Sequence, residues 1–199
     1  MQMMKMMVQE SEISRTYSNK QNLLLVGEGD FSFSLSLAKA FGSDTSITAT
    51  SLDTRDELGR QYNNGKANVE ELEKLGCTVV KGVNVHSMTL DDRLGRYDII
   101  VFNYPHAGKH KDLVRGFMEN AREMVQEEGG EIHVTHKTIY PFNKWETKTF
   151  AEENGLSLIN QMQLNKWAFP GYVSNKRGSG SNFESSFSFG SVVTFMFKN

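Results

Sequence analysis

Residues 23–32 read LLLVGEGDFS, and this stretch decides the fold. The apolar run 23–26 ends at Gly27, as a buried parallel strand does where it enters a tight turn. The apolar positions within 35–41 then supply one face of a helix, which Gly42 ends. Two glycines at alternate positions between a strand and a helix are typical of the nucleotide-binding turn of an α/β domain.

The rest of the chain continues this alternation of strands and helices. We expect further strands at 47–52, 79–80, 98–102 and 132–135, and helices at 66–75 and 111–126. Residues 156–164 and 193–197 alternate apolar and polar positions with no helix between them, which predicts an antiparallel pair. The prediction is a Rossmann-like methyltransferase fold of the α/β class, with a mostly parallel twisted sheet and an antiparallel C-terminal strand. We assign 1–21 to a flexible N-terminal lead-in and 22–199 to the domain.

The composition restricts the class of protein. A chain of 199 residues that is 38% hydrophobic can bury the core of one globular domain. Its net charge of -2 gives no overall attraction for nucleic acid, so any RNA contact needs a local basic patch. The single cysteine, Cys77, excludes an internal disulfide and fits a reducing compartment. We find no secretory signal and no run near the roughly 18 apolar residues of a membrane span, so we expect an intracellular protein without a membrane partner.

The glycine loop carries two carboxylates, Glu28 and Asp30, that favour one class of cofactor. The pyrophosphate of NAD or FAD would lie beside both, and a like-charge contact at about 4 Å costs around 4 kcal/mol. S-adenosylmethionine (SAM) has no phosphate and carries a sulfonium and an ammonium, which carboxylates attract. The alternative is that both carboxylates only favour the helix N-terminus. We select as SAM-binding residues Gly27, Glu28, Gly29, Asp30, Phe31 and Ser32.

Asp53 ends the second predicted strand, 24 residues after Gly29. An acidic residue at about this spacing commonly accepts hydrogen bonds from ribose hydroxyls. Because SAM and NAD both contain that ribose, Asp53 supports a nucleoside site without separating the two cofactors. The alternative is a cap for a helix that starts at Thr54.

The end of the strand 98–102 leads into Asn103, Tyr104, Pro105 and His106. Ligands of open α/β sheets bind outside the carboxyl ends of the strands, so these residues form a candidate catalytic pocket for a base. Asn103 can hydrogen-bond a nucleobase edge, Tyr104 can stack, and His106 can take a proton near neutral pH. The alternative is a strand-terminating turn with a surface histidine.

Four histidines raise the question of a metal site. His133 and His136 lie three apart on a predicted strand, so their side chains should point to opposite faces. With one cysteine and no paired spacing with His106 or His110, we expect no metal site.

Several motifs together resemble the 25S rRNA (uridine-N3)-methyltransferase-like family, and most closely its plant-type members. The matching motifs are GEGDFSFS (27–34), TSLD (50–53), FNYPHAG (102–108), EIHVT (131–135) and FPGY (169–172). The resemblance covers about residues 23–197. It implies a Rossmann-like fold, SAM as methyl donor, and N3 of a uridine in large-subunit rRNA as acceptor. A nucleolar or cytoplasmic location, with the monomer favoured, is the corresponding expectation.

Two departures from the family pattern bear on activity. Gly108 passes directly to Lys109, where family members usually carry a longer segment at the mouth of the active site. An inactive SAM-binding paralogue, acting as an RNA- or protein-binding module, is therefore the alternative hypothesis. Asn84 stands where the family typically has Asp; its carbonyl can still accept from the adenine amino group, though more weakly. A nicotinamide-dependent oxidoreductase is the third hypothesis, which Glu28 and Asp30 disfavour.

The segment 133–177 is the candidate RNA surface. It holds six Lys or Arg residues against three acids, with tryptophan, phenylalanine and tyrosine between them. The alternative is an ordinary mixed surface with aromatic residues that belong to the core. We select as RNA-binding residues Lys137, Lys144, Trp167, Tyr172, Lys176 and Arg177.

Overall fold

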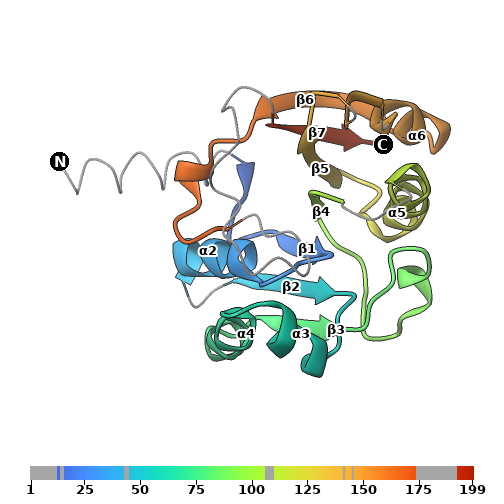
Figure 1. The fold of residues 1–199 in the computed structure, drawn as a ribbon. Helices are drawn as coiled ribbons and strands as arrows, with labels where there is room; N and C mark the ends of the chain where they lie inside the picture. Colours follow the sequence, from blue (N-terminus) through green and yellow to red (C-terminus); the bar gives the residue numbers. More distant parts are fainter. Residues whose placement is uncertain are drawn as a thin grey trace.

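The structure, a computed structural model, describes residues 13, 16–42, 45–105, 110–140, 142–144, 146–173 and 192–199. Its framework is one seven-stranded sheet with the strand order β3-β2-β1-β4-β5-β7-β6 (Figure 1). The strands are β1 (Asn22–Val26), β2 (Ser46–Ser51), β3 (Thr78–Lys81), β4 (Ile99–Asn103), β5 (Glu131–Lys137), β6 (Ser157–Gln163) and β7 (Val192–Lys198). The helices are α2 (Ser32–Phe41), α3 (Arg55–Gln61), α4 (Gly65–Lys74), α5 (His110–Met124) and α6 (Thr147–Glu153), with short 3-10 turns η2 (Met88–Leu90), η3 (Phe142–Lys144) and η4 (Lys166–Ala168).

The first five strands run parallel, because each returns to the sheet through a crossover connection. β1 lies between β2 and β4, with Leu24 opposite Thr48 on one side and Ile100 on the other. β7 enters between β5 and β6 and is antiparallel to both. The sheet therefore confirms the predicted fold class, including the antiparallel C-terminal pair.

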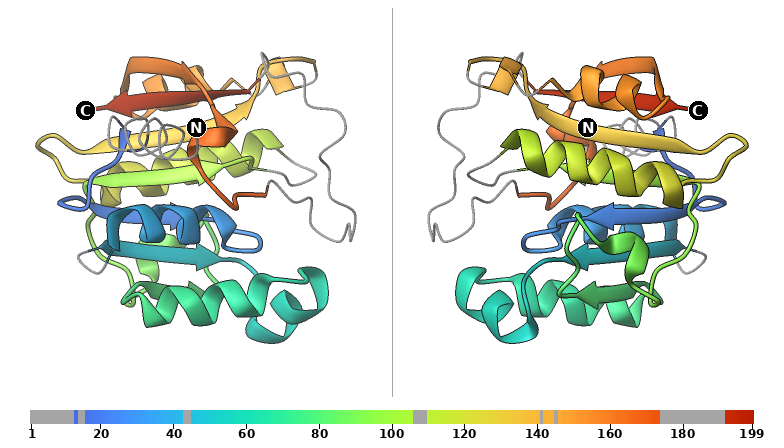
Figure 2. Two further views of the ribbon diagram at one scale, coloured as in Figure 1. Left: turned by 90° about the vertical axis from the view of Figure 1, so that its left-hand side faces the viewer. Right: turned by 90° about the vertical axis from the view of Figure 1, so that its right-hand side faces the viewer.

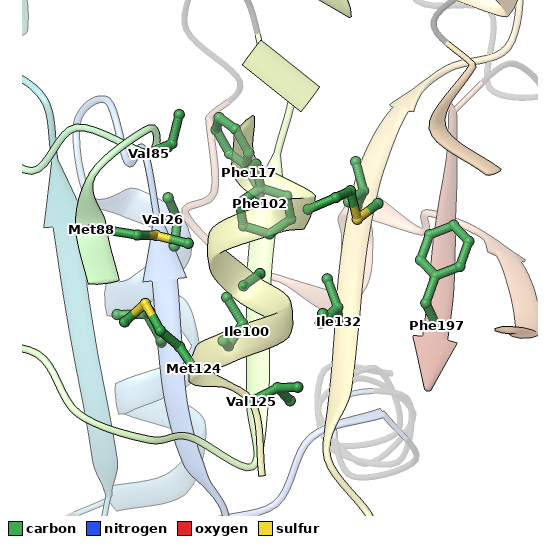
Figure 3. Packing of buried hydrophobic residues seen from close by; sticks show 14 of the residues in the cluster. Val26, Val85, Met88, Ile100, Phe102, Phe117, Met124, Val125, Ile132 and Phe197 are labelled. Atoms are coloured by element: carbon green, nitrogen blue, oxygen red, sulfur yellow. The ribbon is translucent and has the colours of Figure 1, made fainter. Parts of the chain in front are cut away.

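Alternate residues of the strands feed two separate cores. Leu24, Ile100 and Ile132 pack with α5 and α6. Figure 3 shows Ile100, Ile132, Phe102 and Phe117 in this core, and the ring centroids of Phe102 and Phe117 lie 4.9 Å apart. Leu23 and Leu25 point to the other face, which α2 and α4 cover (Figure 2). Strands buried on both faces read as continuous apolar runs, as 23–26 does.

The short helix α6 was not predicted from the sequence, and α3 was named only as the helix starting at Thr54 in the alternative for Asp53. α3 and α6 have seven residues each, too few to show a clear apolar period. α3 begins with a capping box, in which Thr54 Oγ1 accepts from the Glu57 N–H and the Glu57 carboxylate accepts from the Thr54 N–H.

Two described residues of the segment 1–21 pack against the domain. Ile13 and Tyr17, which we had assigned to the flexible lead-in, are 2% and 4% exposed. The Tyr17 hydroxyl lies 3.3 Å from His133 Nδ1, and its ring meets the edge of Phe33 with centroids 6.4 Å apart. These two residues are therefore part of the core on the α2 face.

Candidate functional site

A cavity of about 200 Å³ opens at the carboxyl ends of the parallel strands. The loops after β1, β2, β3 and β4 line it, together with Tyr172 and Val173. This is the edge of an open α/β sheet where ligands bind. Of the residues selected from the sequence, the cavity brings together Gly27, Glu28, Gly29, Asp30, Asp53, Asn84, Asn103, Tyr104 and Tyr172.

The two glycines of the loop after β1 allow close packing at the cavity wall. Gly27 has a φ of 67°, and a Cβ there would lie 2.6 Å from Cε2 of Phe102. A Cβ on Gly29 would lie 3.1 Å from the hydroxyl oxygen of Tyr62. A side chain at position 27 is thus opposed both by the backbone conformation and by β4, whereas position 29 is restricted by its neighbour.

Glu28 and Asp30 both bind the N-terminus of α2 while lining the cavity. Glu28 Oε2 accepts hydrogen bonds from the Ser34 hydroxyl (2.8 Å) and the Ser34 N–H (3.2 Å). Asp30 Oδ1 accepts from the Ser32 N–H at 3.0 Å. The same two carboxylates therefore both stabilise the N-terminus of α2 and line the cavity.

The charge of Glu28 is sensitive to its surroundings. Burial raises the pKa of this carboxyl from 4.5 to about 7; the bonds from Ser34 oppose the rise, and the neighbouring Asp30 adds to it. A cation in the cavity would favour the ionised form of Glu28 and so would be bound more strongly by it.

Phe31 and Ser32, also selected for SAM binding, do not line the cavity. The Phe31 side chain is fully buried in the core beneath α2, although its backbone has a φ of 61°. The Ser32 hydroxyl accepts from the Val173 N–H at 3.0 Å. Ser32 therefore ties the distant segment at 172–173 to the glycine loop.

Asp53 and Asn84 lie at the ends of neighbouring parallel strands. Asp53 is buried and lines the cavity, and the cap of α3 is Thr54. The alternative that Asp53 serves as that cap is therefore wrong. Asn84 is exposed, and its Oδ1 accepts from the His86 N–H at 3.0 Å, which orients the amide beside the cavity.

Asn103 and Tyr104 form the opposite wall, where β4 ends. Within the described residues, Asn103 Nδ2 is one of two buried side-chain polar atoms without a hydrogen-bond partner. Tyr104 has a φ of 50°, uncommon for a tyrosine, and its N–H donates to the Thr135 carbonyl at 2.7 Å. Burial raises the pKa of its phenol, so Tyr104 is protonated at neutral pH. His106 lies outside the described residues.

The structure divides the predicted RNA surface. Tyr172 is half-buried, lines the cavity and packs on Phe33 at 5.0 Å, so it lies apart from the exposed residues of this segment, and its role in RNA binding stays a prediction. Phe169 is buried on the same phenylalanine. Trp167 is 63% exposed and Lys144 is exposed, while Lys137 is half-buried and desolvation lowers its pKa. Lys176 and Arg177 lie outside the described residues.

Several lining residues were missed by the sequence analysis. Leu52, Val83 and Val85 flank Asp53 and Asn84 in the chain, and the strand-end rule could have found them. Tyr62 and Leu113 come from helical segments, and nothing in the local sequence pointed to them. Together these side chains give apolar walls between the polar groups of the cavity.

His133 and His136 point to opposite faces of β5, as predicted. His133 meets Tyr17 and lies 2.8 Å from Glu131 Oε2, whereas His136 Nε2 lies 2.9 Å from the Thr147 hydroxyl. Across the described ranges, no group of three potential metal ligands occurs. Within those same ranges, no helix has the length and apolar character to span a bilayer.

Comparison with known proteins identifies relatives of this chain. The family model described as BMT5-like, rRNA (uridine-N3-)-methyltransferase BTM5-like, matches residues 24–176. Uncharacterized protein At4g26485 of Arabidopsis thaliana is 45% identical over 199 residues, covering 92% of this chain and 95% of that protein. The 25S rRNA (uridine(2634)-N(3))-methyltransferase of Saccharomyces cerevisiae is 23% identical over 228 residues, covering 82% of this chain and 68% of that protein.

Solved structures share the fold at low sequence identity. The N-methyltransferase NodS of Bradyrhizobium japonicum WM9 has a TM-score of 0.58 at 12% identity, covering 98% of this chain and 96% of that one. At this identity the likeness concerns the fold alone, and it confirms the predicted Rossmann-like methyltransferase architecture.

Proposed function

Because this chain belongs to the BMT5-like family of rRNA methyltransferases, we propose that it transfers a methyl group from SAM to N3 of a uridine in large-subunit rRNA. One observation carries the proposal beyond family membership. A single cavity joins the carboxylates of the loops after β1 and β2 to an amide and a phenol at the end of β4. The first group suits a cationic nucleoside, and the second suits a nucleobase edge.

The residues on the β1–β3 side fit SAM. Glu28 and Asp30 provide negative charge at the glycine loop, and Asp53 provides a buried acceptor for ribose hydroxyls. Leu52, Val83 and Val85 supply the apolar walls that an adenine ring requires. When bound, SAM supplies an electrophilic methyl group on its sulfonium.

The residues on the β4 side fit a uracil. The Asn103 amide lines the cavity with a buried donor that lacks a protein partner among the described residues. Rotation about the last torsion of the side chain would direct Nδ2 to a uracil carbonyl beside N3. The new hydrogen bond would remove the cost of a buried donor without a partner, about 1–3 kcal/mol. Tyr104, whose N–H donates to the Thr135 carbonyl at 2.7 Å, lines the same space and has a protonated phenol.

N3 of uracil carries a proton that must leave as the nitrogen bonds to the methyl carbon. The high pKa of Tyr104 makes this phenol a hydrogen-bond donor rather than a base. His106, two residues further along the chain, is our proposed proton acceptor. Alignment by Asn103 is expected to contribute most, since misplacement by about 1 Å can lower a rate on the order of a hundredfold.

The direct experiment is transfer of labelled methyl groups from SAM to large-subunit rRNA. The wild-type chain should transfer label to N3 of a uridine, and Asn103→Ala should lower the rate on the order of a hundredfold with SAM affinity nearly intact. Asn84→Ala is the matched amide control; it should weaken SAM binding but leave the rate at saturating SAM nearly unchanged.

The outcomes separate the hypotheses. If Asn103→Ala lost SAM binding and methyl transfer in parallel, Asn103 would belong to the SAM site. That result would contradict its proposed contact with the uridine. SAM binding by the wild-type chain without transfer to rRNA would instead support the inactive paralogue, which the direct passage from Gly108 to Lys109 suggests. NADH binding without SAM binding would reject both.

A further inference from the structure

An exposed aromatic side chain lies beside a lysine where the chain leaves β5. Tyr140 is 72% exposed, and Lys144 Nζ lies 5.1 Å from the centroid of its ring. Ile139, the preceding residue, is 51% exposed. The Tyr140 ring is therefore open to solvent on one face, with a cation held beside it.

The position of Tyr140 relates it to the acceptor side of the cavity. Thr135 pairs with Asn103 in the sheet, and its carbonyl accepts the Tyr104 N–H. Tyr140 follows Thr135 by five residues, a span of at most roughly 17 Å of extended chain. Figure 2 shows the segment after β5 at the same end of the sheet as the loop after β2. Tyr140 therefore lies at the end of the sheet where the cavity opens, at most roughly 17 Å from Thr135.

The segment that contains Tyr140 carries more lysines than acids. Within 137–148 the sequence has three lysines and one acid, Glu146. The Glu146 carboxylate is paired with Lys111 at 2.6 Å, so its charge is largely compensated. Lys144 therefore presents its ammonium beside the ring without a competing acid from this segment, where a phosphate next to a stacked base would lie.

We propose that Tyr140 and Lys144 form a stacking platform for an unpaired base that flanks the target uridine. The proposal rests on the proposed function, since it assumes that single-stranded RNA enters the β4 side of the cavity. An aromatic ring stacks on any base, and a neighbouring lysine contacts the backbone phosphate. A flat ring exposed under a cation suits a base better than it suits an apolar peptide side chain, which would need a groove to cover it.

The test is fluorescence anisotropy with a labelled, uridine-rich single-stranded RNA of about 12 nucleotides. Tyr140→Ala should raise the dissociation constant between about 5-fold and 100-fold, because a base loses its stacking partner. Tyr140→Phe should leave binding nearly unchanged, since the ring is kept. Lys144→Ala should weaken binding and reduce the slope of its salt dependence by about 0.7. Leu90→Ala is the matched control, because Leu90 is 85% exposed on the connection between β3 and β4.

Every outcome decides the proposal. Equal binding by Tyr140→Ala and Leu90→Ala would overturn it, as would equal losses in the alanine and phenylalanine variants or no binding by the wild type. Losses of the same size with duplex RNA, which offers no unpaired base, would also overturn it. Methyl transfer to rRNA, measured alongside, tests the proposed function separately: Tyr140-dependent binding without transfer would keep Tyr140 and Lys144 as a base-stacking site and reject the methyltransferase.

Discussion

The loop after β1 and the turn after β4 line the same cavity but satisfy their polar groups in different ways. In the loop, Glu28 and Asp30 are bonded to the first turn of α2. At the last residue of β4, just before the turn, Asn103 has a buried Nδ2 without a partner among the described residues. The polar groups of one wall are bonded within the protein, and the other wall has one buried donor without a partner in the part of the chain that the structure describes.

This difference separates two ways of building a binding site. Preformed contacts lower the cost of ordering the protein when a ligand binds, which suits a cofactor bound in every turnover. An unsatisfied buried amide destabilises the empty site but rewards a ligand that offers an acceptor. We therefore expect changes on the β1–β3 side to alter stability and cofactor affinity, and changes on the β4 side to alter chemistry.

The largest effect should come from Gly27→Ala, because the added methyl group would collide with Phe102 where the loop after β1 packs against β4. The left-handed backbone and the 2.6 Å approach to Phe102 together predict a loss of about 2–5 kcal/mol in the free energy of unfolding, with loss of SAM binding. Urea unfolding and SAM titration measure both. Gly76→Ala is the control, because Gly76 has a φ of 85° with no atom close to its Cβ position and should lose only about 1–2 kcal/mol. Equal losses of unfolding free energy in the two variants would show that the Phe102 side chain moves aside to make room for the added methyl group.

Glu28→Gln should change how the stability of the protein depends on pH. The folded-state pKa of Glu28, about 7, lies above the ordinary 4.5, so the folded protein holds a proton that the unfolded chain has released. Glu28 therefore stabilises the fold below pH 4.5 and loses about 3 kcal/mol of that contribution as the pH rises through 7.

The glutamine variant should lack this decline, because its side chain does not ionise. Thermal unfolding from pH 4 to pH 8 compares the two profiles, and SAM titration should show wild-type affinity rising through pH 7 while that of Glu28→Gln stays flat. Parallel pH profiles of stability for the two proteins would mean that Glu28 does not titrate in this range.

A smaller effect is expected at the end of β2, where two adjacent residues have different roles. The main effect of Asp53→Ala should be on SAM binding, weakened from a few-fold to about a hundredfold through lost hydrogen bonds worth roughly 1–3 kcal/mol. Thr54→Ala should do the reverse and lower stability by about 1 kcal/mol by removing the cap of α3. Calorimetric SAM titration and urea unfolding of both variants test this; unchanged affinity in Asp53→Ala would exclude Asp53 from the cofactor site.

The sequence by itself determined the features that depend on neighbouring residues. The run 23–26 followed by two glycines predicted β1, its loop and α2, because strand burial and glycine turns are local properties. Alternation along β5 placed His133 and His136 on opposite faces for the same reason. The strand-end rule also located Asp53 and Asn103 at one edge of the sheet, and the cavity contains both.

Only the tertiary structure decided which aromatic residues are buried. Trp167 and Tyr172 are five residues apart in a segment of similar composition, yet Trp167 is exposed and Tyr172 packs on Phe33 beside the cavity. The bond between Ser32 and Val173, across 141 positions of sequence, holds Tyr172 there. Tyr17 likewise joins the core through His133, which is 116 positions away. Burial of this kind depends on contacts between distant segments, and a local pattern of residue types does not contain those distances.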